Sequence, residues 1–165
     1  MVKYFMVIHF AADHAGFDLK EKLKIYLKEL GYEVKDHGAF EYNEKDDYPD
    51  FIRFAAKAVA ENPEIDRAVV LGGSGQGEAM IANRFQGVRA AVFYGKPYLE
   101  AKPPSERAVS ISVIKLSREH NNANVLSLGA RFLSEEEAKE AVKLWLKTPF
   151  SEEARHQRRI RKIDI

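Results

Sequence analysis

The segment with the clearest chemical potential is a glycine-rich loop, Gly72-Gly73-Ser74-Gly75-Gln76-Gly77. Four glycines in six residues allow the backbone to approach a ligand closely. A helix expected to begin at the end of this loop would point unpaired N–H groups toward an anion. Glu78 lies in the first turn of that helix, where a carboxylate can serve as a general base beside a bound ligand. The alternatives are a tight strand–helix turn without a ligand and an ordinary acidic residue at a helix start.

Three familiar glycine motifs do not match this loop. A phosphate-binding P-loop requires Lys-Ser/Thr after the last glycine, and Glu78-Ala79 stands there. The dinucleotide fingerprint requires a third glycine at the position of Glu78. A nucleophile elbow requires glycine where Gln76 stands. The loop therefore does not predict a nucleotide-binding protein or a serine hydrolase of these types.

Two polar segments elsewhere are further candidates. Asp13-His14-Ala15-Gly16 follows the first apolar run, where it can bind a polar ligand or simply cap a helix. His120-Asn121-Asn122 precedes a later apolar run, and a lone histidine in such a place is commonly structural. The five histidines show neither H-x-H nor H-E-x-x-H spacing, so we expect no metal site. The chain has no cysteine, which excludes disulfides and a cysteine nucleophile.

Hydrophobic patterning predicts which elements position these residues. Apolar runs indicate five strands, and helical spacing or capping signals indicate five helices. The strands are expected at Val2–Ala12, Tyr32–His37, Ala68–Leu71, Val88–Phe93 and Val125–Leu128. The helices are expected around Leu19–Leu30, at Asp50–Glu61, from Glu78 to Arg84, from the Ser134/Glu137 capping box to Thr148, and at Ser151–Arg161.

Alternating strands and helices predict an α/β protein with a parallel sheet covered by helices on both faces. In such sheets, ligands bind at the carboxyl ends of the strands. This rule selects Asp13-His14 and the loops that follow Leu71, Phe93 and Leu128. The candidate residues of the glycine loop and of the first segment are therefore expected at one edge of the sheet.

Length and composition are those of one globular domain. The 165 residues are 45% hydrophobic and 31% charged, with a formal net charge of +1. This near-neutral balance argues against nucleic acid as a partner. No apolar run has the length of a membrane span, and Met1–Ala12 resembles a strand more than a signal peptide, so we expect a cytoplasmic protein without a membrane partner. A basic tail, Arg155–Lys162, is the exception to the even charge distribution.

Taken in order, the motifs resemble those of the ribose-5-phosphate isomerase type B family. The match extends over nearly the whole chain, and each motif alone is weak whereas the ordered set is specific. The segments are Asp13-His14-Ala15-Gly16, Asp47-Tyr48-Pro49, Gly72 to Glu78, Ala82-Asn83, Gly87-Val88-Arg89-Ala90, Arg118 to Asn124, Leu128-Gly129-Ala130-Arg131 and Arg155-His156-Gln157-Arg158-Arg159.

The resemblance implies a fold and an activity. The fold would be a Rossmann-like three-layer sandwich with a five-stranded parallel sheet and a C-terminal helix that reaches a partner subunit. The activity would be interconversion of ribose 5-phosphate and ribulose 5-phosphate without a cofactor, in a homodimer or dimer of dimers with shared active sites. One branch of the family uses a cysteine at the position of Gly72, and another uses a glutamate at the position of Glu78. This chain resembles the second branch.

The resemblance also implies a role for each site residue. Glu78 would be the base, His120 would open the furanose ring, and Ser74 would join the loop N–H groups in stabilising an enediolate oxygen. Asp13 and Tyr48 would contact the sugar. The remaining residues that would bind substrate are the loop residues Gly73, Gly75, Gln76 and Gly77, and the hydroxyl- and phosphate-binding residues His14, Asn121, Arg131, Arg155 and Arg159. Arg155 and Arg159 are one helical turn apart and would form a forked phosphate site.

Residues 1–165 are therefore expected to form a single domain with one unusual segment. Residues 95–117 make the chain longer than the family pattern, and we expect an inserted loop there. Because such a loop can reshape the pocket, a hexose 6-phosphate of the allose or galactose type is an alternative substrate. A sugar-phosphate-binding protein without catalytic activity is a second alternative, and an RNA-binding domain that uses the basic tail is a third.

Overall fold

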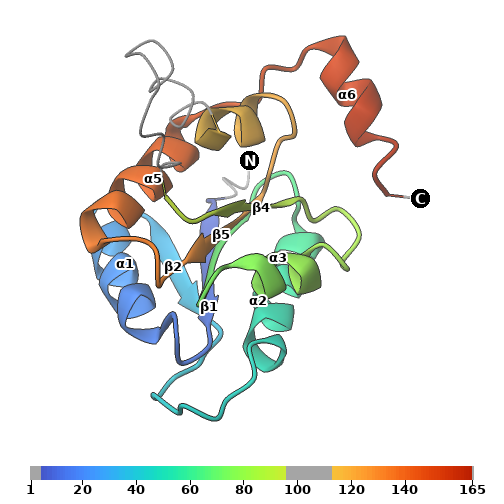
Figure 1. The fold of residues 1–165 in the computed structure, drawn as a ribbon. Helices are drawn as coiled ribbons and strands as arrows, with labels where there is room; N and C mark the ends of the chain where they lie inside the picture. The colour runs from blue at the N-terminus through green and yellow to red at the C-terminus, as the bar shows by residue number, and fades with distance from the viewer. Residues whose placement is uncertain (1–4, 96–112, 165) are drawn as a thin grey trace, which may run out of the picture.

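The computed structural model describes residues 5–95 and 113–164, which form a sheet with helices on both sides (Figure 1). The strands are β1 (Val7–Ala12), β2 (Glu33–Asp36), β3 (Arg67–Gly72), β4 (Ala90–Phe93) and β5 (Val125–Gly129). The labelled helices are α1 (Phe17–Glu29), α2 (Pro49–Glu61), α3 (Gln76–Ala82), α5 (Glu135–Lys147) and α6 (Ala154–Ile160). Residues 113–119 are also helical.

The five strands form one parallel sheet with the order β2-β1-β3-β5-β4. Phe10 of β1 pairs with Val69 of β3, and Val69 pairs in turn with Leu126 of β5. From β1 the chain continues to β2 at one edge of the sheet. From β3 it continues to β4 and β5, on the other side of the sheet. The strand order therefore changes direction at β1 and β3, and in open sheets of this kind the ligand crevice lies at such a point.

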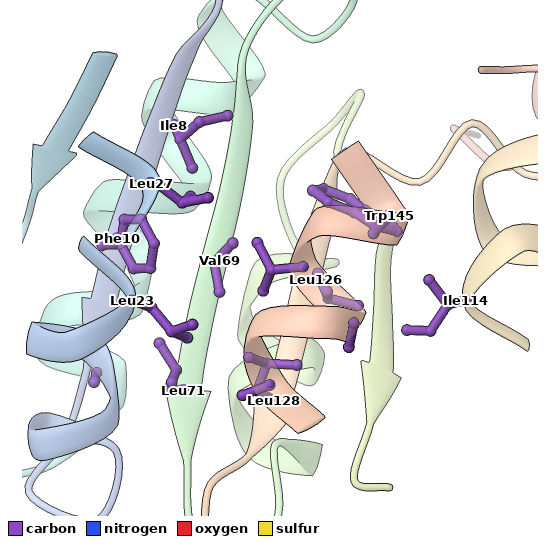
Figure 2. Close-up of a cluster of buried hydrophobic side chains, with 14 of the residues drawn as sticks. Ile8, Phe10, Leu23, Leu27, Val69, Leu71, Ile114, Leu126, Leu128 and Trp145 are labelled. Atoms are coloured by element: carbon purple, nitrogen blue, oxygen red, sulfur yellow. The ribbon is translucent and has the colours of Figure 1, made fainter. Parts of the chain in front are cut away.

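Helices cover both faces of the sheet, as the alternating pattern predicts. On one face, α1 and α5 pack over a buried cluster that includes Phe10, Leu27, Leu126 and Trp145 (Figure 2). On the other face, α2 and α3 cover a second cluster that includes Ile52, Val59 and Val70. The three-layer α/β sandwich expected from the sequence is confirmed.

Local signals explain where several helices begin and end. Ser134 accepts a hydrogen bond from the backbone N–H of Glu137, and the Glu137 side chain bonds back to Ser134, so the predicted capping box starts α5. Pro49 occupies the first turn of α2, where its missing N–H has no intrahelical partner to lose. Gly31 follows α1 with φ +86°, a conformation that favours glycine and ends the helix.

Several element boundaries differ by a few residues from the sequence expectation, and two differences have a visible structural cause. The fourth strand begins at Ala90, not Val88, because the side chain of Asn124 accepts the backbone N–H of Arg89 at 2.7 Å in place of a neighbouring strand. The expected loop over 95–117 is wrong at its end, since residues 113–117 are helical and Ile114 is buried in the core. Residues 96–112, the rest of the expected insertion, lie outside the described part of the chain.

The C-terminal helix α6 lies apart from the three layers (Figure 1). It attaches through His156, whose ring stacks on His120 with centroids 4.2 Å apart, and through the N–H of Ser151, which donates to the carbonyl of Glu119. Its other side chains are mostly exposed. None of the helices in the described ranges combines the length and apolar character needed to cross a bilayer.

Candidate active site

The carboxyl ends of β1, β3 and β5 meet at a cavity of about 340 Å³. It is lined from four directions: the turn after β1, the start of α2, the glycine loop after β3, and the turn after β5. The lining residues are Asp13, His14, Ala15, Tyr48, Gly73, Ser74, Gly77, Glu78, Arg131 and Phe132. The cavity therefore lies where the sheet topology places a ligand site.

Glu78 is buried at 4% exposure, with its carboxyl group folded back over the end of β3. A Cβ atom at Gly72 would overlap that carboxyl group, so glycine at position 72 is what makes room for Glu78. Burial raises the pKa of Glu78, and the negative charge of Asp13 raises it further. A carboxylate with a raised pKa is a stronger base than one in water.

The glycine loop is shaped by close contacts with its neighbours. A Cβ at Gly77 would lie 2.6 Å from the ring of Tyr48, and one at Gly73 would lie 3.3 Å from the guanidinium of Arg131. Gly75 has φ +77°, which favours glycine at this turn. The side chain of Ser74 accepts the backbone N–H of Gln76 at 3.3 Å. Gly75 and Gln76 complete the turn but do not line the cavity.

Asp13 and His14 are held in place by hydrogen bonds at the end of β1. The Asp13 carboxylate accepts the N–H groups of Ala15 at 3.0 Å and Gly16 at 3.4 Å, so it also caps the turn before α1. Both the backbone N–H and the Nδ1 of His14 bond to one oxygen of Asp46, at 3.0 and 2.7 Å. Burial raises the pKa of Asp13, whereas the hydrogen bond to Asp46 raises the pKa of His14.

These three side chains also have the composition of a possible metal site. One ligand atom from each of Asp13, His14 and Asp46 lies within 4.8 Å of the others. However, the Nδ1 of His14 is bonded to Asp46, and Asp13 already accepts backbone N–H groups. A cation would have to replace these hydrogen bonds, so the arrangement fits a hydrogen-bonded cluster better than a set of free ligands.

Four of the predicted residues lie away from Glu78 in the described part of the chain. His120 stacks on His156 at an interplanar angle of 14°, and Asn121 lines a separate cavity of about 450 Å³. Arg155 and Arg159 are exposed on α6, where Nε of Arg155 donates to Glu153 at 2.7 Å. The predicted residues in the described part of the chain thus fall into two sets: a base cluster around Glu78, and a second set outside that cavity, His120, Asn121, Arg155 and Arg159.

Comparison with known proteins identifies the family. The family model described as ribose/galactose isomerase matches residues 8–101 and 107–163. The chain belongs to the ribose/galactose isomerase family. The residues that the match omits inside the chain, 102–106, fall in the segment where the sequence predicts an insertion.

Curated members of the ribose/galactose isomerase family include similar proteins from several bacteria. Ribose-5-phosphate isomerase B of Mycolicibacterium paratuberculosis is 38% identical over 155 residues, covering 94% of this chain and 87% of that protein. Ribose-5-phosphate isomerase B of Escherichia coli is 38% identical over 156 residues, covering 94% and 93%.

Solved structures agree with this membership. Ribose-5-phosphate isomerase B from Mycoplasma genitalium, with bound ribulose 5-phosphate, superposes with a TM-score of 0.84 at 35% identity and covers 97% of this chain and 95% of that one. The enzyme from Thermotoga maritima gives 0.81 at 40% identity, covering 98% and 99%.

Sequence reasoning missed two residues at or next to this candidate site. Phe132 lines the cavity although the residue is 61% exposed. The only sequence signal for Phe132 was its position directly after Arg131. Asp46 contacts His14 across 32 positions of sequence. Its only signal was its place beside Asp47-Tyr48-Pro49, because no local pattern reveals a contact between two separate loops.

Proposed function

We propose that this chain is an aldose–ketose isomerase that interconverts ribose 5-phosphate and ribulose 5-phosphate through an enediolate, without a metal or organic cofactor. The observation that carries the proposal is the buried Glu78 carboxyl in the cavity that the glycine loop borders. The names of the relatives and the ribulose 5-phosphate bound in the Mycoplasma genitalium structure support this substrate class.

Glu78 is the base in this proposal. Its carboxylate removes the proton from C2 of the open-chain aldose and returns a proton to C1, while the hydroxyl proton of O2 passes to O1, which yields the ketose. Space for this carboxylate exists because position 72 is glycine. The chain has no cysteine to serve instead.

The glycine loop stabilises the charge that develops during this transfer. Gly73, Ser74 and Gly77 line the cavity next to Glu78 and would supply the donors, with Gly75 and Gln76 maintaining the turn. Preorganised donors of this kind commonly supply a large part of an enzyme's rate enhancement. Asp13, His14, Tyr48 and Arg131 line the rest of the cavity, where they would bind hydroxyl or phosphate oxygens.

The second set of residues completes the site from another subunit. We place His120 as the acid–base group that opens the furanose ring, with Asn121, Arg155 and Arg159 as phosphate and hydroxyl ligands. The support is that these residues do not line the Glu78 cavity of their own described chain, whereas α6 projects from the domain (Figure 1). A homodimer, or a dimer of dimers, with active sites shared between subunits follows from this assignment.

The family description names two sugars, so the substrate needs a direct test. The experiment is a panel of ribose 5-phosphate, allose 6-phosphate and galactose 6-phosphate, assayed with purified protein in excess chelator. We expect the highest kcat/KM on ribose 5-phosphate. A preference for a hexose phosphate would show that the proposed substrate is wrong. No turnover of any of these sugars would indicate a sugar-phosphate-binding protein without catalytic activity.

We expect the protein to act in the cytoplasm, since phosphorylated sugars are charged metabolites of the cell interior. We expect no nucleic-acid or membrane partner. The proposal treats residues 1–165 as one domain, with the sugar phosphate and a second copy of the chain as its partners.

A further inference from the structure

The contact between His14 and Asp46 fixes the orientation of the imidazole ring through hydrogen bonds. A single oxygen of Asp46 accepts two hydrogen bonds from the same residue, the backbone N–H of His14 at 3.0 Å and its Nδ1 at 2.7 Å. The Tyr42 ring meets the imidazole edge-on, with centroids 6.4 Å apart. Since Nδ1 is engaged on Asp46, Nε2 is the ring nitrogen that remains for the cavity that His14 lines.

The surroundings of Asp46 favour a charged partner. Its side chain is only 6% exposed, and its second oxygen, Oδ2, is buried without a hydrogen-bond partner in the described structure. A buried carboxylate with one unsatisfied oxygen is unfavourable unless an opposite charge lies next to it. His14 lies at hydrogen-bond distance from Asp46 and can supply that charge, so this contact stabilises the protonated form of His14.

The other charged groups around His14 act in both directions. Asp13, on the same turn, favours the protonated imidazole, and Arg131, from the turn after β5, opposes it. The hydrogen bond to Asp46 is the largest influence, and the resulting pKa of His14 is raised above 6.5. Asp46 itself does not line the cavity, so any effect on a ligand must pass through His14.

We propose that Asp46 is a positioning residue that orients the imidazole of His14 and favours its protonated form, so that its Nε2–H donates to an oxygen of the sugar phosphate. This inference rests on the proposed function for the identity of the ligand. The hydrogen bonds from His14 to Asp46 do not depend on the proposed function.

The first test follows the imidazole of His14 directly by NMR titration of the ligand-free protein, with His14→Asn used to assign its signal. Asp46→Asn keeps the size of the side chain and removes its charge. We expect the His14 titration midpoint to fall in Asp46→Asn and to stay at the wild-type value in Glu44→Gln, which removes an exposed charge from the same loop. Equal midpoints in wild type and Asp46→Asn would overturn the proposal, whether or not the chain is an isomerase.

The second test measures kcat/KM on ribose 5-phosphate across pH for the same variants. Above both midpoints, Asp46→Asn should lose about tenfold in kcat/KM for each pH unit by which the His14 midpoint falls. The loss should appear mainly in KM and should disappear below both midpoints, where His14 is protonated in either protein. A loss that is uniform across pH would instead show a structural defect and would contradict the positioning role.

Discussion

At the scale of single residues, Gly72 and Glu78 behave as a matched pair. The Glu78 carboxyl group occupies the volume that any side chain at position 72 would require. Burial and the nearby Asp13 raise the pKa of Glu78. Ionisation of Glu78 therefore costs stability, but it makes the carboxylate a stronger proton acceptor. This conflict between stability and basicity is expected of a catalytic carboxylate and is hard to explain for a residue that only packs.

Glu78→Gln should separate catalysis from folding. Loss of a general base typically lowers the rate by about 10²–10⁴-fold, and we expect kcat for ribose 5-phosphate to fall by that order. Because the folded-state pKa is raised, stability is lost as pH rises from the unperturbed 4.5 through the folded value. The variant should therefore unfold at or above the wild-type temperature at neutral pH. Steady-state kinetics and thermal unfolding check both statements, and near-normal turnover would assign the base elsewhere.

Gly72→Ala should displace the Glu78 carboxyl group and lower kcat without abolishing folding. A shorter carboxylate, Glu78→Asp, leaves room for the added methyl group. We therefore expect Glu78→Asp to reduce kcat less in the Gly72→Ala background than in wild type. A double-mutant cycle on kcat measures this coupling. Strictly additive effects would mean that positions 72 and 78 do not compete for the same space.

At the scale of elements, a buried ion pair fixes the start of the loop that carries Asp46 and Tyr48. Lys20 of α1 is fully buried and donates to both oxygens of Asp36, each at 2.8 Å, and to the carbonyl of Ala39 at 2.6 Å. Lys24 also bonds to Asp36. These contacts join α1 to the end of β2 and to Ala39, and so fix where the loop toward the cavity begins.

Lys20→Met should destabilise the fold strongly at neutral pH. Removing one partner of a buried ion pair costs about 3–5 kcal/mol, and Lys24 should retain part of that. Although burial opposes ionisation, the two lysines hold the pKa of Asp36 below 3.8, so the contribution of the pair is present above that pH and is lost as pH falls through the folded pKa. The difference from wild type should therefore shrink below about pH 3.8.

Denaturant unfolding at pH 7 and pH 3 checks the Lys20 prediction. Lys22→Met is the matched control, because Lys22 is 55% exposed and forms an ion pair with Glu135 on the surface. It should unfold close to wild type, since exposed ion pairs contribute little. Equal stabilities for the Lys20 and Lys22 variants would contradict the role given to the buried pair.

The sequence predicted elements more readily than contacts between them. The five strands, the capping box of α5 and the glycine loop are local patterns, and each was recognisable within a few residues. The start of β4 was misplaced because the side chain of Asn124, 35 residues away, replaces a neighbouring strand as the acceptor of the Arg89 backbone N–H. Asp46 was missed for the same reason, since its partner His14 lies in another loop.

At the scale of the whole molecule, the residues that the family resemblance assigns to one active site fall into two sets. Asp13, His14, Tyr48, Arg131 and the glycine loop gather around Glu78, whereas His120 lies beside α6 and its arginines. The resemblance named both sets and implied active sites shared between subunits. No local sequence pattern could show that the two sets lie at different places in one chain. The proposed site shared between two subunits would bring the two sets together.

Mixed dimers test the shared site. A subunit with Arg155→Ala and Arg159→Ala is combined with a Glu78→Gln subunit, each inactive alone. If the sites are shared, each hybrid dimer holds one site with both defects and one with none, so about half the normal activity per hybrid should return. If each subunit forms its own complete site, every site in the hybrid is defective and activity stays absent.

The most direct test of the central claim is isomerisation of ribose 5-phosphate in deuterium oxide with excess chelator. Proton transfer by Glu78 through an enediolate predicts ribulose 5-phosphate with solvent deuterium at C1, seen by NMR, and no such product from Glu78→Gln above background. Product without deuterium would indicate a hydride shift, and activity that disappears in chelator and returns with a divalent metal would indicate metal catalysis. Either result would contradict a cofactor-free isomerase that uses Glu78 as its base.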